Sequence, residues 1–150
     1  MPVIVDPKGA QWAKYKDVDY ITPNIKEINE IMLEPIQNSD FEVEKAARYA
    51  MRKFHLRNVV LTRSAKGLSL IHGEEVVHIP TKAQEVFDVS GAGDTVIAVF
   101  GLALAGGLKP ADGAYLANLA ASVVVSKLGT YAVSREELLQ VLDHQEGMGL

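Results

Sequence analysis

Short strand-like runs alternate with helix-length segments along this chain, and this alternation restricts its fold more than any other feature. The strand-like runs cover residues 3–5, 19–21 and 58–62, and each is followed closely by a polar or turn-forming residue. Short apolar runs separated by helices are typical of a parallel sheet that is covered by helices on both faces. The sequence therefore predicts an α/β fold with a Rossmann-like, mostly parallel sheet.

Apolar residues at helical spacing, together with helix breakers, predict the helices. The predicted helices cover residues 25–33, 41–54, 93–105, 110–127 and 135–144. Ser39 or Asp40 is a suitable N-cap for the second of them. Two further strand-like stretches, 67–72 and 75–79, are separated by a glycine-containing turn and predict a β-hairpin.

The composition excludes several classes of function. A chain of 150 residues can form one domain with a substantial core. It has 15 basic and 19 acidic residues and no basic cluster suited to nucleic acid. It has no cysteine, so disulfides and thiolate metal sites are excluded. No secretory signal precedes residue 10, and the longest apolar run, 96–107, is shorter than the roughly 20 residues that span a bilayer. We expect a cytoplasmic protein with no membrane partner.

The first predicted strand begins unusually close to Met1. A buried strand with nothing before it suggests that residues 1–150 are the second half of a larger domain, with 145–150 as a frayed tail. An uncovered strand edge pairs readily with another chain. We therefore expect a homodimer, or pairing with a missing N-terminal half.

A turn of small residues, Gly91-Ala92-Gly93, precedes Asp94 and a long apolar helix. The unpaired N–H groups and the positive dipole end of such a helix form a site for phosphate. An acid beside that site makes sense if it takes a proton from a hydroxyl group that attacks the phosphate. The turn has neither P-loop nor dinucleotide-binding spacing. The alternative is an ordinary glycine turn in which Asp94 stabilises the helix by about 0.3–1 kcal/mol.

Asn24 and Glu27 follow the second strand and lie at the predicted start of a helix. Their oxygens suit Mg²⁺, which keeps most of its waters and is shared with nucleotide phosphates. The alternative is a capping box, in which each side chain binds the other residue's backbone N–H. By themselves, these two residues favour the capping box.

Three other regions could contact a nucleotide. Thr62, Ser64 and Gly67 follow the third strand and could bind phosphate or ribose, or simply form a turn. Lys8 could meet a phosphate or be solvated. Asn118 lies in an alanine-rich helix, and a buried asparagine needs a partner, for which an adenine edge is one candidate. The histidines lack metal-ligand spacing.

In chain order, Asn24-x-x-Glu27, the turn from Thr62 to Gly67 and the element Asp88-Val-Ser-Gly-Ala-Gly-Asp94 resemble motifs of the ribokinase-like (PfkB) carbohydrate kinases. The last element is specific for that family when it heads an apolar helix. The resemblance covers essentially the whole chain but only the C-terminal, nucleotide-binding half of the family's domain. Stretches such as VIVDPKG, LTRSAKGLSL and VVVSKLGT are most similar to the branch that acts on D-glycero-β-D-manno-heptose 7-phosphate.

This resemblance implies a reaction. Asp94 would be the general base on the sugar C1 hydroxyl, and the turn Gly91-Ala92-Gly93 would provide backbone amides for the transferring γ-phosphoryl group of ATP. The products would be the 1,7-bisphosphate and ADP, in the supply of ADP-heptose for the lipopolysaccharide core. The family's sugar-binding segments and lid belong to the half that this chain lacks, so weak ATP binding and little sugar phosphorylation are expected of it alone.

The resemblance also implies the binding residues. Asn24 and Glu27 would hold Mg²⁺ through water, and Asp88 would help to bind a monovalent cation such as K⁺. The ATP site would be lined by Thr62, Ser64, Gly67 and Asn118, with Lys8 near the phosphates. Ser64 stands where many members have glycine. Two alternatives stay open: another sugar or nucleoside kinase of the same fold, and a non-catalytic fragment or subunit that pairs with a partner chain.

Overall fold

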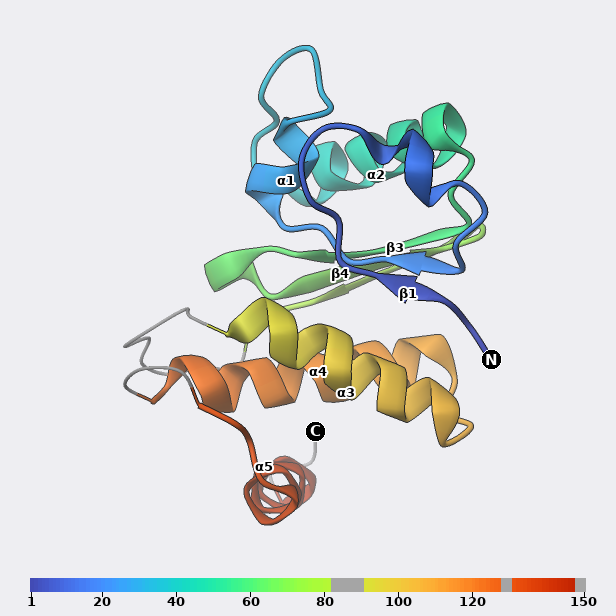
Figure 1. The fold of residues 1–150 in the computed structure, drawn as a ribbon. Coiled ribbons are helices and arrows are strands. Elements are labelled where there is room, and N and C mark those ends of the chain that lie inside the picture. The colour runs from blue at the N-terminus through green and yellow to red at the C-terminus, as the bar shows by residue number, and fades with distance from the viewer. Residues whose placement is uncertain (82–90, 128–130, 148–150) are drawn as a thin grey trace.

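A five-stranded sheet lies between two helical layers (Figure 1). The computed structural model describes residues 1–81, 91–127 and 131–147, with side chains up to residue 143. The strands are β1 (Ile4–Val5), β2 (Tyr20–Ile21), β3 (Asn58–Thr62), β4 (Leu68–His72) and β5 (Glu75–Ile79), and they lie in the order β1-β2-β3-β4-β5. β1, β2 and β3 pair in parallel, whereas β4 and β5 continue the sheet in antiparallel pairing. The sheet is therefore mixed, because the predicted hairpin extends the parallel part.

The helices cover both faces of the sheet. They are α1 (Ile25–Asn29), α2 (Asp40–Phe54), α3 (Ala92–Ala105), α4 (Pro110–Val125) and α5 (Arg135–Gly147), with short 3₁₀ helices η1 (Trp12–Tyr15) and η2 (Ser64–Lys66). Figure 1 shows α1 and α2 on one face of the sheet and α3 and α4 on the other. The α/β class expected from the sequence is confirmed by this arrangement.

Alternation along β3 divides the core into two halves. Val59 and Leu61 are fully buried on the face that α2 covers, and Val60 is fully buried on the opposite face. On that second face Val60 belongs to a cluster with Phe100 of α3 and Ala114 of α4. Because successive side chains of a strand point to opposite faces, the three consecutive apolar residues at the centre of β3 can pack against both layers.

The predicted helix over 25–33 is too long, because α1 ends at Asn29. The side-chain Oδ1 of Asn29 accepts a hydrogen bond from the backbone N of Ile36 at 2.9 Å, which turns the chain back on itself. The residues in between form i→i+3 bonds, such as Ile31 N to Ile28 O at 3.2 Å. The other helices agree with their predicted bounds to within three residues. No helix in the described ranges is long and apolar enough to span a membrane.

Candidate functional site

The carboxyl ends of the parallel strands meet the start of α3 at one edge of the sheet. Asn24, just after β2, forms an isolated parallel bridge with Thr62 at the end of β3. The backbone N of Thr62 donates to the carbonyl O of Pro23 at 2.9 Å. Asp94 lies in the first turn of α3 and lines the same small cavity as Asn24 and Thr62. Ligands of open α/β sheets bind at such edges.

The small cavity is polar and has a volume of about 120 Å³. It is lined by Asp6, Lys8, Thr22, Asn24, Glu27, Thr62, Gly91, Gly93 and Asp94. Three of these residues carry carboxylates and one carries an ammonium group. At about 30 Å³ for each water molecule, the space holds about four waters, so it suits a hydrated cation or part of a phosphate group.

A larger cavity of about 410 Å³ adjoins the small one and shares Asn24, Thr62 and Gly93 with it. Its other lining residues are Ser64, Ala65, Gly67, Leu68, Thr81, Ala92, Val96, Asn118, Ala121, Ser122 and Val125. This volume lies within the range of about 300–1,000 Å³ that is typical of small-ligand sites. The structure therefore brings together an apolar cavity and a polar one, with the start of α3 between them.

Residues at the start of α3 line both cavities. Gly91, the N-cap, has a positive φ of 78° and no side chain that could accept a hydrogen bond. Intrahelical bonding begins with Thr95 N, which donates to Gly91 O at 2.9 Å. The amides of Ala92, Gly93 and Asp94 precede that bond and have no intrahelical acceptor. This arrangement can bind an anion, and it places the Asp94 carboxylate at the same helix end.

Asn24 and Glu27 form the capping box that was the alternative to a metal site. Asn24 Oδ1 accepts from Glu27 N at 2.7 Å, and Glu27 Oε2 accepts from Asn24 N at 2.8 Å. Both residues nevertheless line the small cavity. A carboxylate oxygen can accept more than one hydrogen bond, so Glu27 can cap α1 and still accept from a water molecule in the cavity.

Lys8 is bound by two carboxylates. Its Nζ lies 2.8 Å from Asp6 Oδ2 and 3.4 Å from Glu27 Oε1. The hydrogen bond with Asp6 raises the pKa of Lys8, and the negative charges of Asp6 and Glu27 raise it further. Asp6 lies at this edge together with Asn24, Thr62 and Asp94, as expected for polar residues that follow the predicted strands. Its position directly after β1, two residues before Lys8, explains this placement.

The turn from Thr62 to Gly67 has an unusual backbone. Ser64 has a positive φ of 51°, which is uncommon for a residue with a side chain. Gly67 has a φ of 89°, and a Cβ atom there would lie 2.0 Å from the carbonyl O of Ile79. Only glycine fits where the turn passes β5, and the turn in this form provides part of the wall of the larger cavity.

Asn118 has a partner within the protein. Its Nδ2 donates to the carbonyl O of Pro80 at 2.9 Å, and its own backbone O accepts from Ser122 Oγ at 2.9 Å. The side chain is almost fully buried and lines the larger cavity. Adenine is therefore not needed to satisfy its N–H group.

Any metal at this edge would be held mainly through water. The described residues contain no group of three or more His, Cys, Asp or Glu side chains that could hold a metal ion. The oxygens of Asn24, Glu27 and Asp94 line the small cavity, so the donor set fits a hydrated Mg²⁺ shared with phosphate. Asp88, the expected K⁺ ligand, lies outside the described residues.

Comparison with known proteins identifies the family. The profile of the pfkB family of carbohydrate kinases matches residues 1–137. The chain belongs to this family. It is 49% identical over 150 residues to the bifunctional protein HldE of Geobacter sulfurreducens, and the alignment covers 99% of this chain and 30% of that protein. It is 48% identical over 146 residues to HldE of Mesorhizobium japonicum, covering 97% of this chain and 29% of that protein. The chain thus spans about 30% of the length of these relatives.

Solved structures of the pfkB family have the same fold. Ribokinase from Thermotoga maritima superposes with a TM-score of 0.83 at 31% identity, over 95% of this chain and 49% of that chain. Arabidopsis thaliana ribokinase, in a complex with ribose and ATP, gives a TM-score of 0.84 at 26% identity, over 95% of this chain and 47% of that chain. The ribokinase-like fold expected from the sequence is confirmed.

Proposed function

We propose that this chain provides the nucleotide site and the catalytic base of a kinase that phosphorylates the C1 hydroxyl of D-glycero-β-D-manno-heptose 7-phosphate. One observation supports the kinase chemistry above all: the start of α3 carries both amides without an intrahelical acceptor and Asp94, and it lies between the polar and the larger cavity. The choice of heptose rests on the resemblance to the heptose branch and on the similarity to HldE proteins.

Asp94 acts as the general base. It accepts the proton of the sugar C1 hydroxyl as that oxygen forms a bond to the γ-phosphorus of ATP. The bond between the γ-phosphorus and the bridging oxygen breaks, and ADP leaves with the electron pair. The amides of Ala92 and Gly93 and of Asp94 itself stabilise the charge on the transferring group. Phosphoryl transfer depends mainly on such positioning and charge stabilisation.

The larger cavity receives the nucleotide. Thr62 and Ser64 offer hydroxyl groups at one end of it, and Gly67 allows close approach to the backbone. Asn118 holds the end of β5 against α4 and borders the same space. The phosphates then extend past Gly93 into the small cavity, which opens beside it.

The small cavity balances the phosphate charge. Mg²⁺, when bound there, neutralises charge on the phosphates. Asn24 and Glu27 would hold its waters through their side-chain oxygens, and Lys8 would turn from Asp6 and Glu27 towards a phosphate oxygen. Asp88 contributes to a K⁺ site.

The remaining parts of the active site come from polypeptide outside this chain. We infer that residues 1–150 form the C-terminal half of the kinase domain and that the sugar-binding segments and lid belong to the other half, in the same polypeptide or in a partner. Homodimerisation through β1 is the corresponding assembly. The complete cytoplasmic protein would contribute to ADP-heptose and lipopolysaccharide core synthesis.

Replacement of the base tests the kinase chemistry. In the full-length protein, Asp94→Asn removes the proton acceptor, so kcat should fall by about 10²–10⁴-fold. ATP binding, measured by calorimetry, should remain because the amides are intact. Asp112→Asn, at the exposed start of α4, is the matched control and should keep full activity. An Asp94→Asn protein with unchanged turnover would refute the proposal.

Another sugar kinase of this fold is the second candidate, and 31% identity to a ribokinase favours ribose as its substrate. The two candidates are separated by assaying the full-length protein with heptose 7-phosphate, ribose and fructose 6-phosphate. Preference for either of the last two would overturn the heptose assignment.

A further inference from the structure

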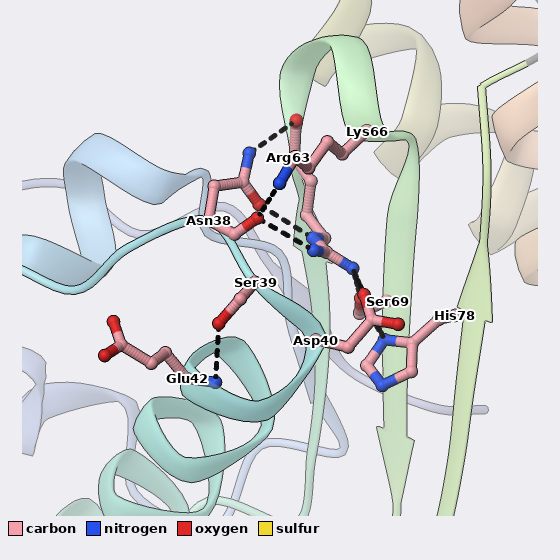
Figure 2. Close-up of polar contacts among 8 residues, drawn as sticks. All are labelled: Asn38, Ser39, Asp40, Glu42, Arg63, Lys66, Ser69 and His78. Carbon is pink, nitrogen blue, oxygen red and sulfur yellow. Dashed lines mark hydrogen bonds and ion pairs between the residues drawn. The ribbon is translucent and has the colours of Figure 1, made fainter.

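Arg63 is a buried arginine next to the nucleotide-facing turn, but it lines neither cavity. Its side chain is 3% exposed. Figure 2 shows its guanidinium between the start of α2 and the strands β4 and β5. Nη1 lies 2.6 Å from Asp40 Oδ1 and donates to Ser69 Oγ at 3.1 Å. His78 Nδ1 is 3.4 Å from the same nitrogen and 2.7 Å from Ser69 Oγ. A buried charge persists only when it is paired and hydrogen-bonded in this way.

Asn38 binds both the side chain and the backbone of Arg63. Its Oδ1 accepts from Arg63 Nε at 2.8 Å, and its backbone O accepts from Arg63 Nη2 at 3.2 Å. In return, Asn38 Nδ2 donates to the carbonyl O of Arg63 at 3.0 Å. Lys66 Nζ donates to the backbone O of Asn38 at 2.6 Å. The loop before α2 is thereby joined to both ends of η2 (Figure 2).

These bonds hold a strained turn through Arg63 and Asn38, which line neither cavity. Thr62 and Ser64, the two neighbours of Arg63, both line the larger cavity. Ser64 has its positive φ of 51° in this turn. Such a conformation persists only where the surrounding structure enforces it. Besides the Asn38 bonds, Arg63 N donates to Gly67 O at 2.8 Å, which closes the turn.

We propose that Arg63, clamped by Asn38 and Asp40, is a positioning residue that keeps the turn 62–67 in its nucleotide-binding conformation. The inference rests on the proposed function, because it assigns the larger cavity to ATP. The guanidinium acts through the backbone of the turn and contacts no nucleotide atom. Loss of the clamp lowers the population of the competent turn, and the apparent Kd for ATP rises by the same factor.

The first test replaces the guanidinium and keeps the charge. Arg63→Lys retains the pairing with Asp40 but cannot reproduce the forked bonds to Asn38. In the full-length protein we expect the Kd and KM for ATP to rise about tenfold, with kcat at saturating ATP changed less than about twofold. Arg48→Lys is the matched control. Arg48 joins α2 to the carbonyls of Gly73 and Glu74, in the turn at the other end of β4, and its replacement should leave ATP affinity unchanged.

The second test determines whether the strained conformation of Ser64 causes the loss of ATP affinity in Arg63→Lys. In the Arg63→Lys background, Ser64→Gly removes the side chain that disfavours positive φ, and Ser64→Ala removes only the hydroxyl. Both replacements remove the hydroxyl, so their difference reports the backbone conformation alone, and we expect Ser64→Gly to bind ATP more tightly than Ser64→Ala. Equal effects of the two replacements would overturn the inference.

The outcomes separate this inference from the proposed function. ATP affinity that is unchanged by Arg63→Lys, while Asp94→Asn still abolishes turnover, would overturn the positioning role and leave the kinase assignment standing. A loss of kcat without a change in ATP affinity would also overturn it. Failure of the unaltered full-length protein to bind ATP would overturn both.

Discussion

At the scale of single residues, the turn beside β5 requires that Gly67 has no Cβ atom. Gly67 and Gly73 both have positive φ, 89° and 58° respectively, so both positions disfavour a side chain. Their surroundings differ. A Cβ at Gly67 would lie 2.0 Å from Ile79 O, whereas a Cβ at Gly73 would meet no atom within 4 Å. The pair therefore separates backbone strain from a direct collision.

We expect Gly67→Ala to destabilise the protein more than Gly73→Ala. The Gly73 variant should lose about 1–2 kcal/mol of unfolding free energy, which is the ordinary penalty for a left-handed residue with a Cβ. The Gly67 variant should lose at least about 2 kcal/mol more, because the turn must move away from β5. Urea denaturation of both variants measures the difference. Equal losses of unfolding free energy in the two variants would mean that the turn can move away from β5 at no cost in stability.

At the scale of elements, α2 depends on its first turn. Ser39 Oγ accepts from Glu42 N at 3.3 Å, and Asp40 begins the helix. The hydrogen bond from Arg63 holds the pKa of Asp40 below its usual value, and the nearby His78, Arg63 and Lys66 charges lower it further. The ionised Asp40 therefore stabilises the folded state, and this contribution is complete above the pKa that Asp40 has when unfolded.

Acid should remove that contribution. As pH falls through the lowered folded pKa of Asp40, below 3.8, protonation abolishes its pairing with Arg63. We expect Asp40→Asn to be less stable than the parent at pH 7 and equally stable below that pKa. Chemical denaturation at several pH values between 7 and 2.5 measures this difference, with Asp112→Asn as the control. A difference that does not change with pH would contradict the assignment.

The sequence predicts the bounds of α2 well and those of α1 poorly. It identified α2 because Ser39 is a good cap and the apolar spacing continues without a break. It overestimated α1 because the bond from Ile36 to Asn29 involves a loop whose path is not encoded in periodicity. The Arg63–Asn38 clamp was missed for a similar reason: its residues are far apart in sequence and belong to different elements. The position of Asp94 in the first turn of α3 could be predicted because it depends only on neighbouring residues.

At the scale of the whole molecule, the larger cavity joins several elements. Its walls come from the turn after β3, from α3 through Val96 and from α4 through Ala121. A ligand that binds there contacts the helical layer of α3 and α4 and the edge of the sheet. Binding to the folded state alone stabilises a protein by about 2.7 kcal/mol when the ligand is present at 100 times its Kd.

We expect ATP to raise the Tm of the full-length protein, and Ala121→Leu to abolish the increase by filling the cavity. Ala105→Leu, at the exposed end of α3, adds the same volume outside the cavity and should keep the increase. Thermal unfolding with and without ATP measures both effects. An undiminished increase with Ala121→Leu would place the nucleotide elsewhere.

The strand order has a consequence for how the chain folds. Every strand of the described sheet pairs with the next one in the sequence, so the longest loop that a ladder closes covers residues 22–57, and loop-closure entropy grows only slowly with length. The sheet can therefore grow in the order of synthesis. Packing of α3 on β1, where a Cβ at Gly101 would lie 3.5 Å from Ile4 Cδ1, joins distant parts of the chain. We expect the sheet to form first on the ribosome and the ligand-binding cavities to be completed last.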